Sequence, residues 1–332
     1  MKSLIQTLVE IPGPSGHEAK IRQAIREILE PVADEVRMDA LGNLIARKGQ
    51  VGEGGRRIML AAHMDEIGVM VTHVDENGYA RFTTVGGVRA QNCPGVRVRF
   101  MNGCQGIIGV ERQEENGKAL TIEQMYIDLG ISNRKDCPVR VGDVAAFERP
   151  FLDLGNRLVA KSMDDRIGVV VLLETLRQIT GSPNEVYFVF SVQEEVGVRG
   201  ATTAAFGIDP DLGLAVDVTS TGDTPNGIKM EVSLGKGPAI KVRDAGMLAD
   251  PRVVDWMART AENAGIPFQM EILEKGGTDA RAIQLTRAGV PAGCISIPCR
   301  YVHSQSEMVD YNDVENAVRL LVALLTQPID LK

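Results

Sequence analysis

The chain has 332 residues, of which 44% are hydrophobic and 24% are charged, and its formal net charge is −8. This apolar share excludes intrinsic disorder, and no apolar run approaches the ~20 residues that span a bilayer. The acidic balance disfavours nonspecific binding to nucleic acid, so we expect neither a nucleic-acid nor a membrane partner. The length suits two domains, or one large domain that carries an insertion.

The chain begins with an α/β pattern. Helical apolar spacing at residues 3–11 and 18–29 predicts two helices on either side of a turn rich in proline and glycine. Three short runs then predict strands, and the last of them is typical of a strand covered on both faces of a sheet. The predicted strands are residues 36–38, 44–47 and 57–62.

Residues 69–158 have a different sequence pattern. Short alternating runs follow one another, glycines lie between them, and turn signals recur at intervals of roughly 8–12 residues. This spacing is typical of a small all-β barrel or sandwich. We therefore expect an inserted β domain in this part of the chain.

After residue 156 strands and helices alternate again, which favours a mostly parallel sheet with helices on both faces. The simplest organisation is one α/β domain, built from residues 1–68 and 159–332, that the β domain interrupts. The predicted helices are residues 165–178, 251–265, 279–288 and 312–326, and the predicted strands are residues 185–192, 212–217, 268–273 and 292–297.

The five cysteines indicate a reducing compartment. Their number is odd and none belongs to a CxxC pair, so free thiols in a cytoplasmic protein fit better than a disulfide framework. The first 16 residues resemble neither a secretory signal nor a transit peptide. Cys294 and Cys299 are close enough in sequence to share a metal, but burial in an apolar core is the simpler interpretation.

Candidate ligands follow several of the predicted strands. His63 ends the third strand, and Asp65, two residues later, is placed to hold the imidazole in one tautomer. Asp217 ends another strand, and His303 follows the last one. Because parallel strands end at the same edge of a sheet, these side chains are expected to meet there. A mixture of carboxylates and imidazoles suits zinc, cobalt or manganese better than calcium.

Two acidic pairs complete the pattern. Asp164 and Asp165 lie just before the apolar part of a predicted helix, which starts near Ile167. One carboxylate is enough to cap this helix, and the functional alternative is that one of them bridges two metal ions. Glu194 and Glu195 leave a strongly apolar strand. Neighbouring side chains of an extended segment point in opposite directions, so one glutamate can ligate a metal while the other serves as a base. The plainer alternative is a pair of solvated carboxylates.

Together these residues resemble the tetrahedral (TET) or glutamyl aminopeptidases, dinuclear metallopeptidases related to the di-zinc exopeptidases. The resemblance extends from one end of the chain to the other, and the β insertion falls where that family carries its dimerisation domain. The matching stretches are residues 13–18, 61–68, 162–168, 194–201, 216–219, 276–280 and 303–307.

The resemblance implies a site with two divalent ions, Zn²⁺ or Co²⁺. Asp164 would bridge both ions, and a cis peptide bond would follow it. One ion would also be bound by His63 and Asp217, and the other by Glu195 and His303. Glu194 would be the general base, and Asp65 would orient His63.

The resemblance also implies release of N-terminal residues from peptides, and homo-oligomers built from dimers, commonly dodecamers. The preferred N-terminal residue stays open among acidic, aliphatic and basic types. The segment around Gln91 departs from the usual family pattern, which leaves open whether Gln91 reaches the site of a neighbouring subunit.

Three other functions remain as alternatives. A metal-dependent deacylase of amino-acid derivatives is close in chemistry. A metal-independent glycoside hydrolase of the endoglucanase type could use Glu194 or Glu195 with a second carboxylate, but it leaves both histidines without a role and has few aromatic residues for sugar stacking. A non-catalytic binding protein would have no need for the complete set of ligands and base.

Overall fold

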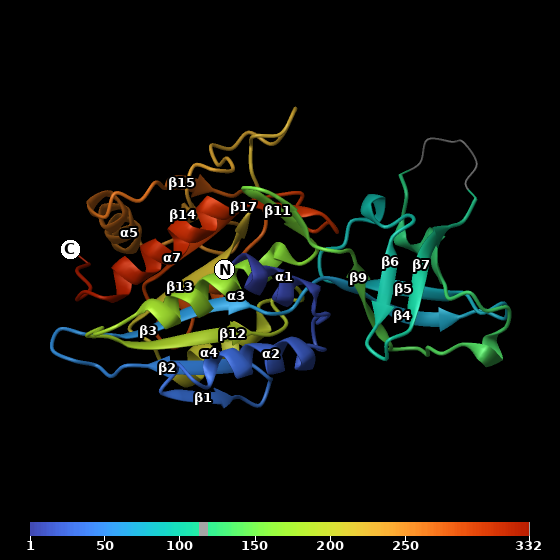
Figure 1. Cartoon of the computed structure of the whole chain (residues 1–332), viewed down its shortest axis with the longest axis horizontal. Helices are drawn as coiled ribbons and strands as arrows, with labels where there is room; N and C mark the ends of the chain where they lie inside the picture. The colour runs from blue at the N-terminus through green and yellow to red at the C-terminus, as the bar shows by residue number, and fades with distance from the viewer. Residues whose placement is uncertain (113–118, 332) are drawn as a thin grey trace.

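A mixed sheet of eleven strands forms the centre of the larger lobe. The structure is a computed structural model that describes residues 1–112 and 119–331, and Figure 1 shows it as two lobes. Four parallel strands form the middle of the sheet, and their apolar residues are buried on both faces. In sheet order they are β12 (Glu185–Ser191), β3 (Arg57–His63), β13 (Leu212–Thr219) and β16 (Ala292–Arg300).

Antiparallel strands extend this parallel centre on both sides. The strands β1 (Glu35–Met38) and β2 (Leu44–Lys48) continue it beyond β12. On the other side lie β17 (Glu307–Asp310), β11 (Arg157–Ala160) and β10 (Leu152–Leu154), while β14 (Ala239–Arg243) pairs with both β16 and β15 (Gln269–Ile272). The predicted α/β fold is confirmed, with the parallel arrangement confined to the centre.

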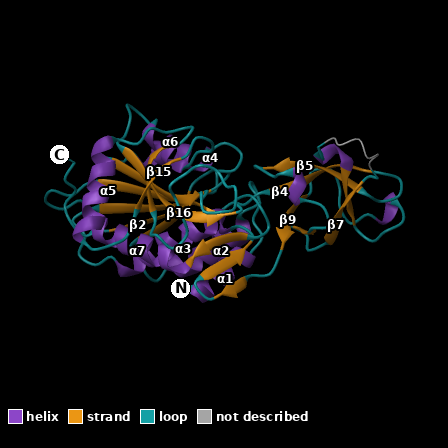
Figure 2. Cartoon of the chain, turned by 90° about the horizontal axis from the view of Figure 1, so that it is seen from above, coloured by secondary structure: helices purple, strands orange, loops and turns teal. Residues whose placement is uncertain are grey.

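Helices cover both faces of the sheet, as Figure 2 shows. Helices α4 and α6 pack their alanine and isoleucine side chains on one face. The other helices bury leucine, valine and isoleucine side chains in the main core on the opposite face. The first group is α4 (Arg199–Ile208) and α6 (Asp279–Gln284), and the second is α1 (Lys2–Glu10), α2 (Ala19–Leu29), α3 (Met163–Gln178), α5 (Pro251–Asn263) and α7 (Tyr311–Leu325).

Two helices differ from the prediction. Helix α6 ends at Gln284, because the chain then turns through Arg287 and Gly289, both of which have positive φ. Helix α4 was not predicted, since its alanines, glycines and threonines give no clear apolar stripe. The other predicted helices agree with the structure to within two residues at each end.

The inserted domain is a closed barrel with its own apolar core. It begins with β4, shortly after His63, and its last strand is β9, so the expected boundary at residue 158 falls later than the barrel itself. Strands β10 and β11 already belong to the large sheet. In barrel order the strands are β4 (Gly68–Val74), β5 (Ala80–Val85), β8 (Met125–Asp128), β7 (Gln105–Val110), β6 (Arg97–Phe100) and β9 (Val144–Glu148).

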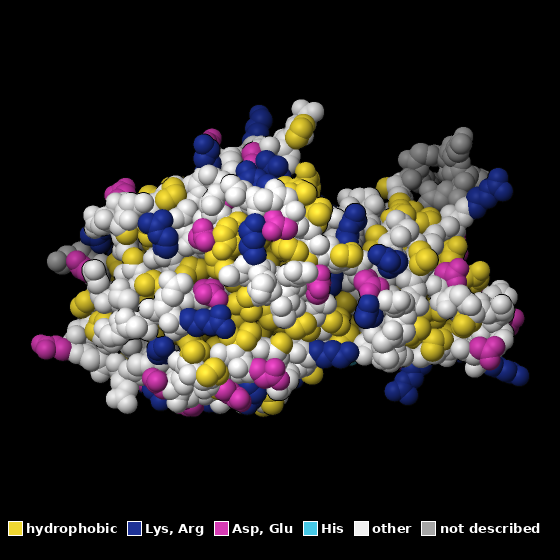
Figure 3. Space-filling model, in the orientation of Figure 1, with side chains coloured by type: hydrophobic (Ala, Val, Ile, Leu, Met, Phe, Trp, Pro, Cys, Tyr) yellow, Lys and Arg dark blue, Asp and Glu magenta, His cyan; other side chains and the backbone are white. Residues whose placement is uncertain are grey.

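The surface carries charges of both signs. On the face drawn in Figure 3, acidic and basic side chains are interspersed over both lobes. Within the described residues, none of the helices is long and apolar enough to cross a membrane.

Candidate metal centre

Imidazole and carboxylate groups gather where the central strands end. His63 is the last residue of β3, Asp217 lies near the end of β13, and His303 follows β16. The side chains of His63 and Asp217 are only 2% and 8% exposed. The structure brings together all five predicted ligands, although they come from five separate segments of the chain.

Asp164 occupies the middle of this group. It lies at the start of α3, and the bond between Asp164 and Asp165 is a cis peptide, as the resemblance implies. Its Oδ1 atom is 3.0 Å from His63 Nε2, and its Oδ2 atom is 3.3 Å from His303 Nε2. Each oxygen of one carboxylate therefore faces a different imidazole.

The site divides into two groups of three donors that share Asp164. His63, Asp164 and Asp217 form one group, and Asp164, Glu195 and His303 form the other; within each, the donor atoms lie within 4.8 Å of one another. Imidazole and carboxylate donors at this spacing fit zinc, cobalt or manganese. The arrangement can hold two cations with one carboxylate between them.

The electrostatics of the site also fit bound cations. Burial, followed by the charge of Asp164, raises the pKa of Asp217 well above its usual range. Burial acts in the same direction on Asp164, but its close contacts with the imidazoles of His303 and His63 outweigh burial and lower the pKa of Asp164. In addition, Glu195 Oε1 is buried without a hydrogen-bond partner. A buried acceptor of this kind is costly unless another group, such as a metal ion, satisfies it.

Asp65 organises the residues around the ligands. His63 Nδ1 lies 3.1 Å from the backbone oxygen of Asp65 and 3.5 Å from its carboxylate oxygen Oδ1. Since a carbonyl oxygen only accepts, this contact places the proton on Nδ1 and leaves Nε2 free to face Asp164. The Asp65 carboxylate meanwhile accepts the backbone N–H groups of Glu194 and Glu195 at 3.0 and 3.2 Å.

Glu194 lies beside the first group of donors without belonging to it. Its Oε2 atom is 3.9 Å from His63 Nε2, and its side chain is 12% exposed. Burial, above all, raises the pKa of Glu194 well above its usual range, and neighbouring carboxylates add to the effect. A raised pKa suits a group that exchanges protons near neutral pH.

Two buried carboxylates near the site were not assigned roles from the sequence. Glu307 accepts the backbone N–H groups of Asp164 and His303 at 2.9 and 2.8 Å, so it ties two candidate ligands together. Asp279 accepts the hydroxyl of Ser191, the residue paired with His63 across the sheet. The one sequence signal for both was their place in the family-like stretches. Cys294 and Cys299 are fully buried in the core and lie outside both donor groups.

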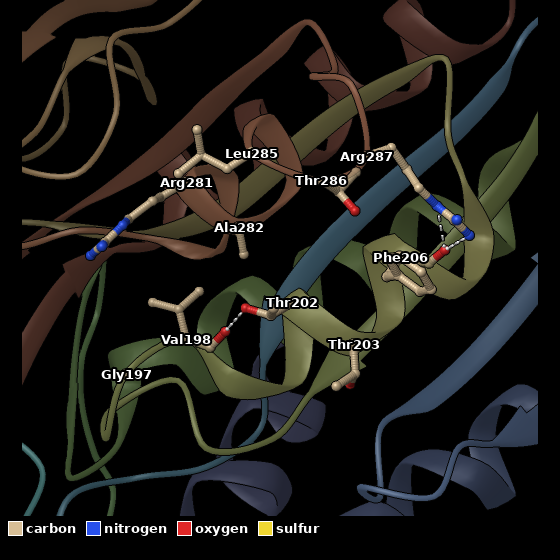
Figure 4. Close-up of a pocket in the computed structure, with 10 residues that line it drawn as sticks. All are labelled: Gly197, Val198, Thr202, Thr203, Phe206, Arg281, Ala282, Leu285, Thr286 and Arg287. Carbon is tan, nitrogen blue, oxygen red and sulfur yellow. Dashed lines mark hydrogen bonds between the residues drawn. The ribbon is translucent and has the colours of Figure 1, made fainter.

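A hollow of about 540 Å³ lies elsewhere, between α4 and α6 (Figure 4). At one end of it the Arg287 guanidinium lies 3.6 Å from the centre of the Phe206 ring and donates to the Phe206 carbonyl oxygen. None of the candidate metal ligands lines this hollow. The donor groups at the strand ends therefore remain the candidate site.

Comparison with known proteins decides the family. The sequence model for the M42 glutamyl aminopeptidases matches residues 42–320. The chain belongs to this M42 family. Like its relatives it is an aminopeptidase, a metal-dependent peptide hydrolase.

Individual relatives support this assignment. The M42 chain is 38% identical to the lysyl aminopeptidase of Pyrococcus furiosus, over 98% of both chains. Its structure resembles that of an aminopeptidase from Desulfurococcus kamchatkensis with a TM-score of 0.94 and 39% identity, covering 98% of this chain and 94% of the other. It also resembles the TET1 peptidase of Pyrococcus horikoshii, which can assemble into a tetrahedron or an octahedral shell, with a TM-score of 0.88 and 32% identity over 98% and 99% of the chains.

Proposed function

We propose that this M42 aminopeptidase releases N-terminal residues from peptides with a centre of two divalent ions, zinc or cobalt. The observation that carries the proposal is the Asp164 carboxylate, which directs one oxygen toward His63 and the other toward His303. Two donor groups that share one carboxylate are what a pair of neighbouring cations needs. The resemblance of the whole chain to aminopeptidases supplies the substrate class.

The proposed ligands follow the two donor groups. His63 and Asp217 would bind one ion, Glu195 and His303 the other, and Asp164 both. When bound, such a pair of ions lowers the pKa of a shared water and polarises the scissile carbonyl.

Glu194 is proposed to move the proton. Its carboxylate lies beside the shared donor atoms but is not needed as a ligand, and its raised pKa allows it to take a proton from water and later return it to the leaving amine. Asp65 would hold Glu194 in place through the backbone N–H group and would keep His63 in the Nδ1–H tautomer.

We further propose that the chain forms dimers through its inserted barrel, from β4 to β9, and that such dimers build a larger homo-oligomer such as a tetrahedral dodecamer. The assembly of the similar Pyrococcus horikoshii enzyme supports this view. Gln91 is exposed on the short helix η1 (Ala90–Asn92) of that domain. Its contact with the metal centre of a neighbouring subunit stays a prediction. All five cysteines are free thiols, which supports a cytoplasmic location.

The test of this function is a substrate panel with controlled metal content. The purified enzyme would be assayed on aminoacyl-p-nitroanilides with acidic, aliphatic and basic residues, and on matched N-blocked peptides, with Zn²⁺ or Co²⁺ and after EDTA. We expect cleavage only of substrates with a free amino group, loss of activity with EDTA, and recovery on adding metal. The ranking of residues would give the specificity, which the names of its relatives do not fix, since they refer to both lysyl and glutamyl enzymes.

Other outcomes would favour the alternatives. Preferential cleavage of N-blocked substrates would indicate a deacylase. Activity on glucans that is indifferent to EDTA would indicate a glycoside hydrolase and would contradict the proposed centre.

A further inference from the structure

The inserted barrel reaches back to the candidate metal centre through two glycines that follow β5. A Cβ atom added to Gly87 would lie 2.4 Å from Nδ1 and 2.5 Å from Cε1 of the His303 ring. A Cβ atom on Gly86 would lie 3.1 Å from Glu195 Oε2. The backbone of the barrel is therefore packed directly against the side chains of two candidate ligands.

The backbone of His303 is held on both sides of the residue. Its N–H group donates to Glu307 at 2.8 Å, and its carbonyl oxygen accepts from the Asn92 side chain of the barrel at 3.3 Å. His303 has a φ of +61°, which is uncommon for a residue with a side chain and persists where surrounding contacts enforce it. The segment of residues 86–92 supplies part of that enforcement, and it also contacts the ring.

The barrel contacts ligands of only one of the two donor groups in this way. The two glycines approach His303 and Glu195, which belong to one donor group. His63 and Asp217, which belong to the other, lie at the ends of β3 and β13, inside the large sheet, and both groups share Asp164. Asp217 is fixed by its own strand and accepts the N–H group of Val218, and the His63 ring is fixed by Asp65. One half of the centre is thus built within the sheet, and the other depends on packing between the two domains.

We propose that residues 86–92 of the inserted barrel are a positioning element for the Asp164–Glu195–His303 donor group. Gly87 leaves the space in which the His303 ring sits, and Asn92 holds the His303 backbone. The barrel thereby sets the affinity of one metal position while it leaves the other unaffected. This inference rests on the proposed metal centre.

The test is the substitution Gly87→Ala, with metal binding as the readout. Gly87 has no positive φ, so alanine adds a methyl group near the His303 ring without backbone strain. Zn²⁺ would be titrated into metal-free enzyme by calorimetry. We expect one of the two binding events to weaken about 10- to 100-fold, as for other changes that displace a ligand, while the second keeps its affinity. The absorption spectrum of the Co²⁺ form is expected to change as well.

The matched control is Gly207→Ala, because an added Cβ atom at Gly207 meets nothing within 4 Å. Thermal unfolding of the metal-free variants would show whether the fold is retained. Should Gly87→Ala not fold, Asn92→Ala makes a smaller change, and we expect it to weaken the same binding event.

Different results would contradict the proposed metal centre and the proposed positioning role of residues 86–92. Wild-type enzyme that binds fewer than two ions would contradict the proposed function itself. Two ions bound by the wild type, with unchanged affinities and an unchanged Co²⁺ spectrum in the folded variants, would refute only the positioning role of residues 86–92. Equal weakening of both binding events would refute it too, since the barrel would then not distinguish the two positions.

Discussion

Glu194→Gln is expected to reduce kcat by about 10²- to 10⁴-fold, the usual contribution of a general base. The amide keeps the size of the side chain but cannot take up and return a proton. The backbone N–H of residue 194 still donates to Asp65 in the variant, so the loop keeps its place. Metal binding is expected to be unchanged, because Glu194 lies outside both donor groups. Steady-state kinetics together with calorimetric titration of Zn²⁺ would check both expectations.

Glu195→Gln is the natural comparison, because the two glutamates are neighbours in sequence. Its Oε2 atom lies 3.2 Å from His303 Nε2, so this change is expected to weaken metal binding as well as activity. Near-normal kcat in Glu194→Gln, or loss of metal from it, would show that the two roles are assigned wrongly.

The position of the site could be predicted because strand ends obey a simple rule. The apolar runs that became β3, β12 and β13 are visible in the sequence, and the carboxyl ends of parallel strands meet at one edge. Polar residues just after such runs are therefore brought together, however distant they are in sequence. His63 and Asp217, 4.0 Å apart between Nε2 and Oδ1, illustrate the rule.

One strand with a buried charge, β14, could not be predicted in this way. Strand β14 contains Lys241, which is fully buried in an ion pair with Glu271 of β15 at 2.6 Å. In the sequence a lysine within a short strand is typical of a surface segment, and Glu271, which pairs with Lys241, is 30 residues away. Glu307 was also not assigned a role. Its carboxylate accepts the backbone N–H groups of Asp164 and His303, and no local sequence pattern reveals such contacts.

A second buried charge network is centred on Glu66, the residue that follows Asp65. Glu66 accepts a hydrogen bond from Lys161 at 2.7 Å, and its other carboxylate oxygen lies 3.7 Å from the Arg166 guanidinium. All three side chains are at most 6% exposed. Burial lowers the pKa of Lys161 and of Arg166, and the charge of Glu66 opposes the shift in both. Glu66 also accepts the N–H of Gly13, so the network joins the N-terminal turn to the start of α3.

Glu66→Gln is therefore expected to lower the free energy of unfolding by about 3–5 kcal/mol, the usual cost of leaving a buried charge without its partner. Glutamine has the same size, so the loss comes from charge and not from a cavity. Urea unfolding of the metal-free enzyme would measure it, because a bound ion would add its own stabilisation.

The control is Asp255→Asn, which breaks the exposed pair with Arg259 on α5 and is expected to change stability by no more than about 0.5 kcal/mol. Adding Lys161→Met to Glu66→Gln removes one of the two stranded cations, so the double variant is expected to be more stable than Glu66→Gln alone. If Glu66→Gln lowered the free energy of unfolding no more than Asp255→Asn does, water would have to reach the Glu66 network. The cations would then be solvated, and the turn at Gly13 and the start of α3 would be held by packing alone.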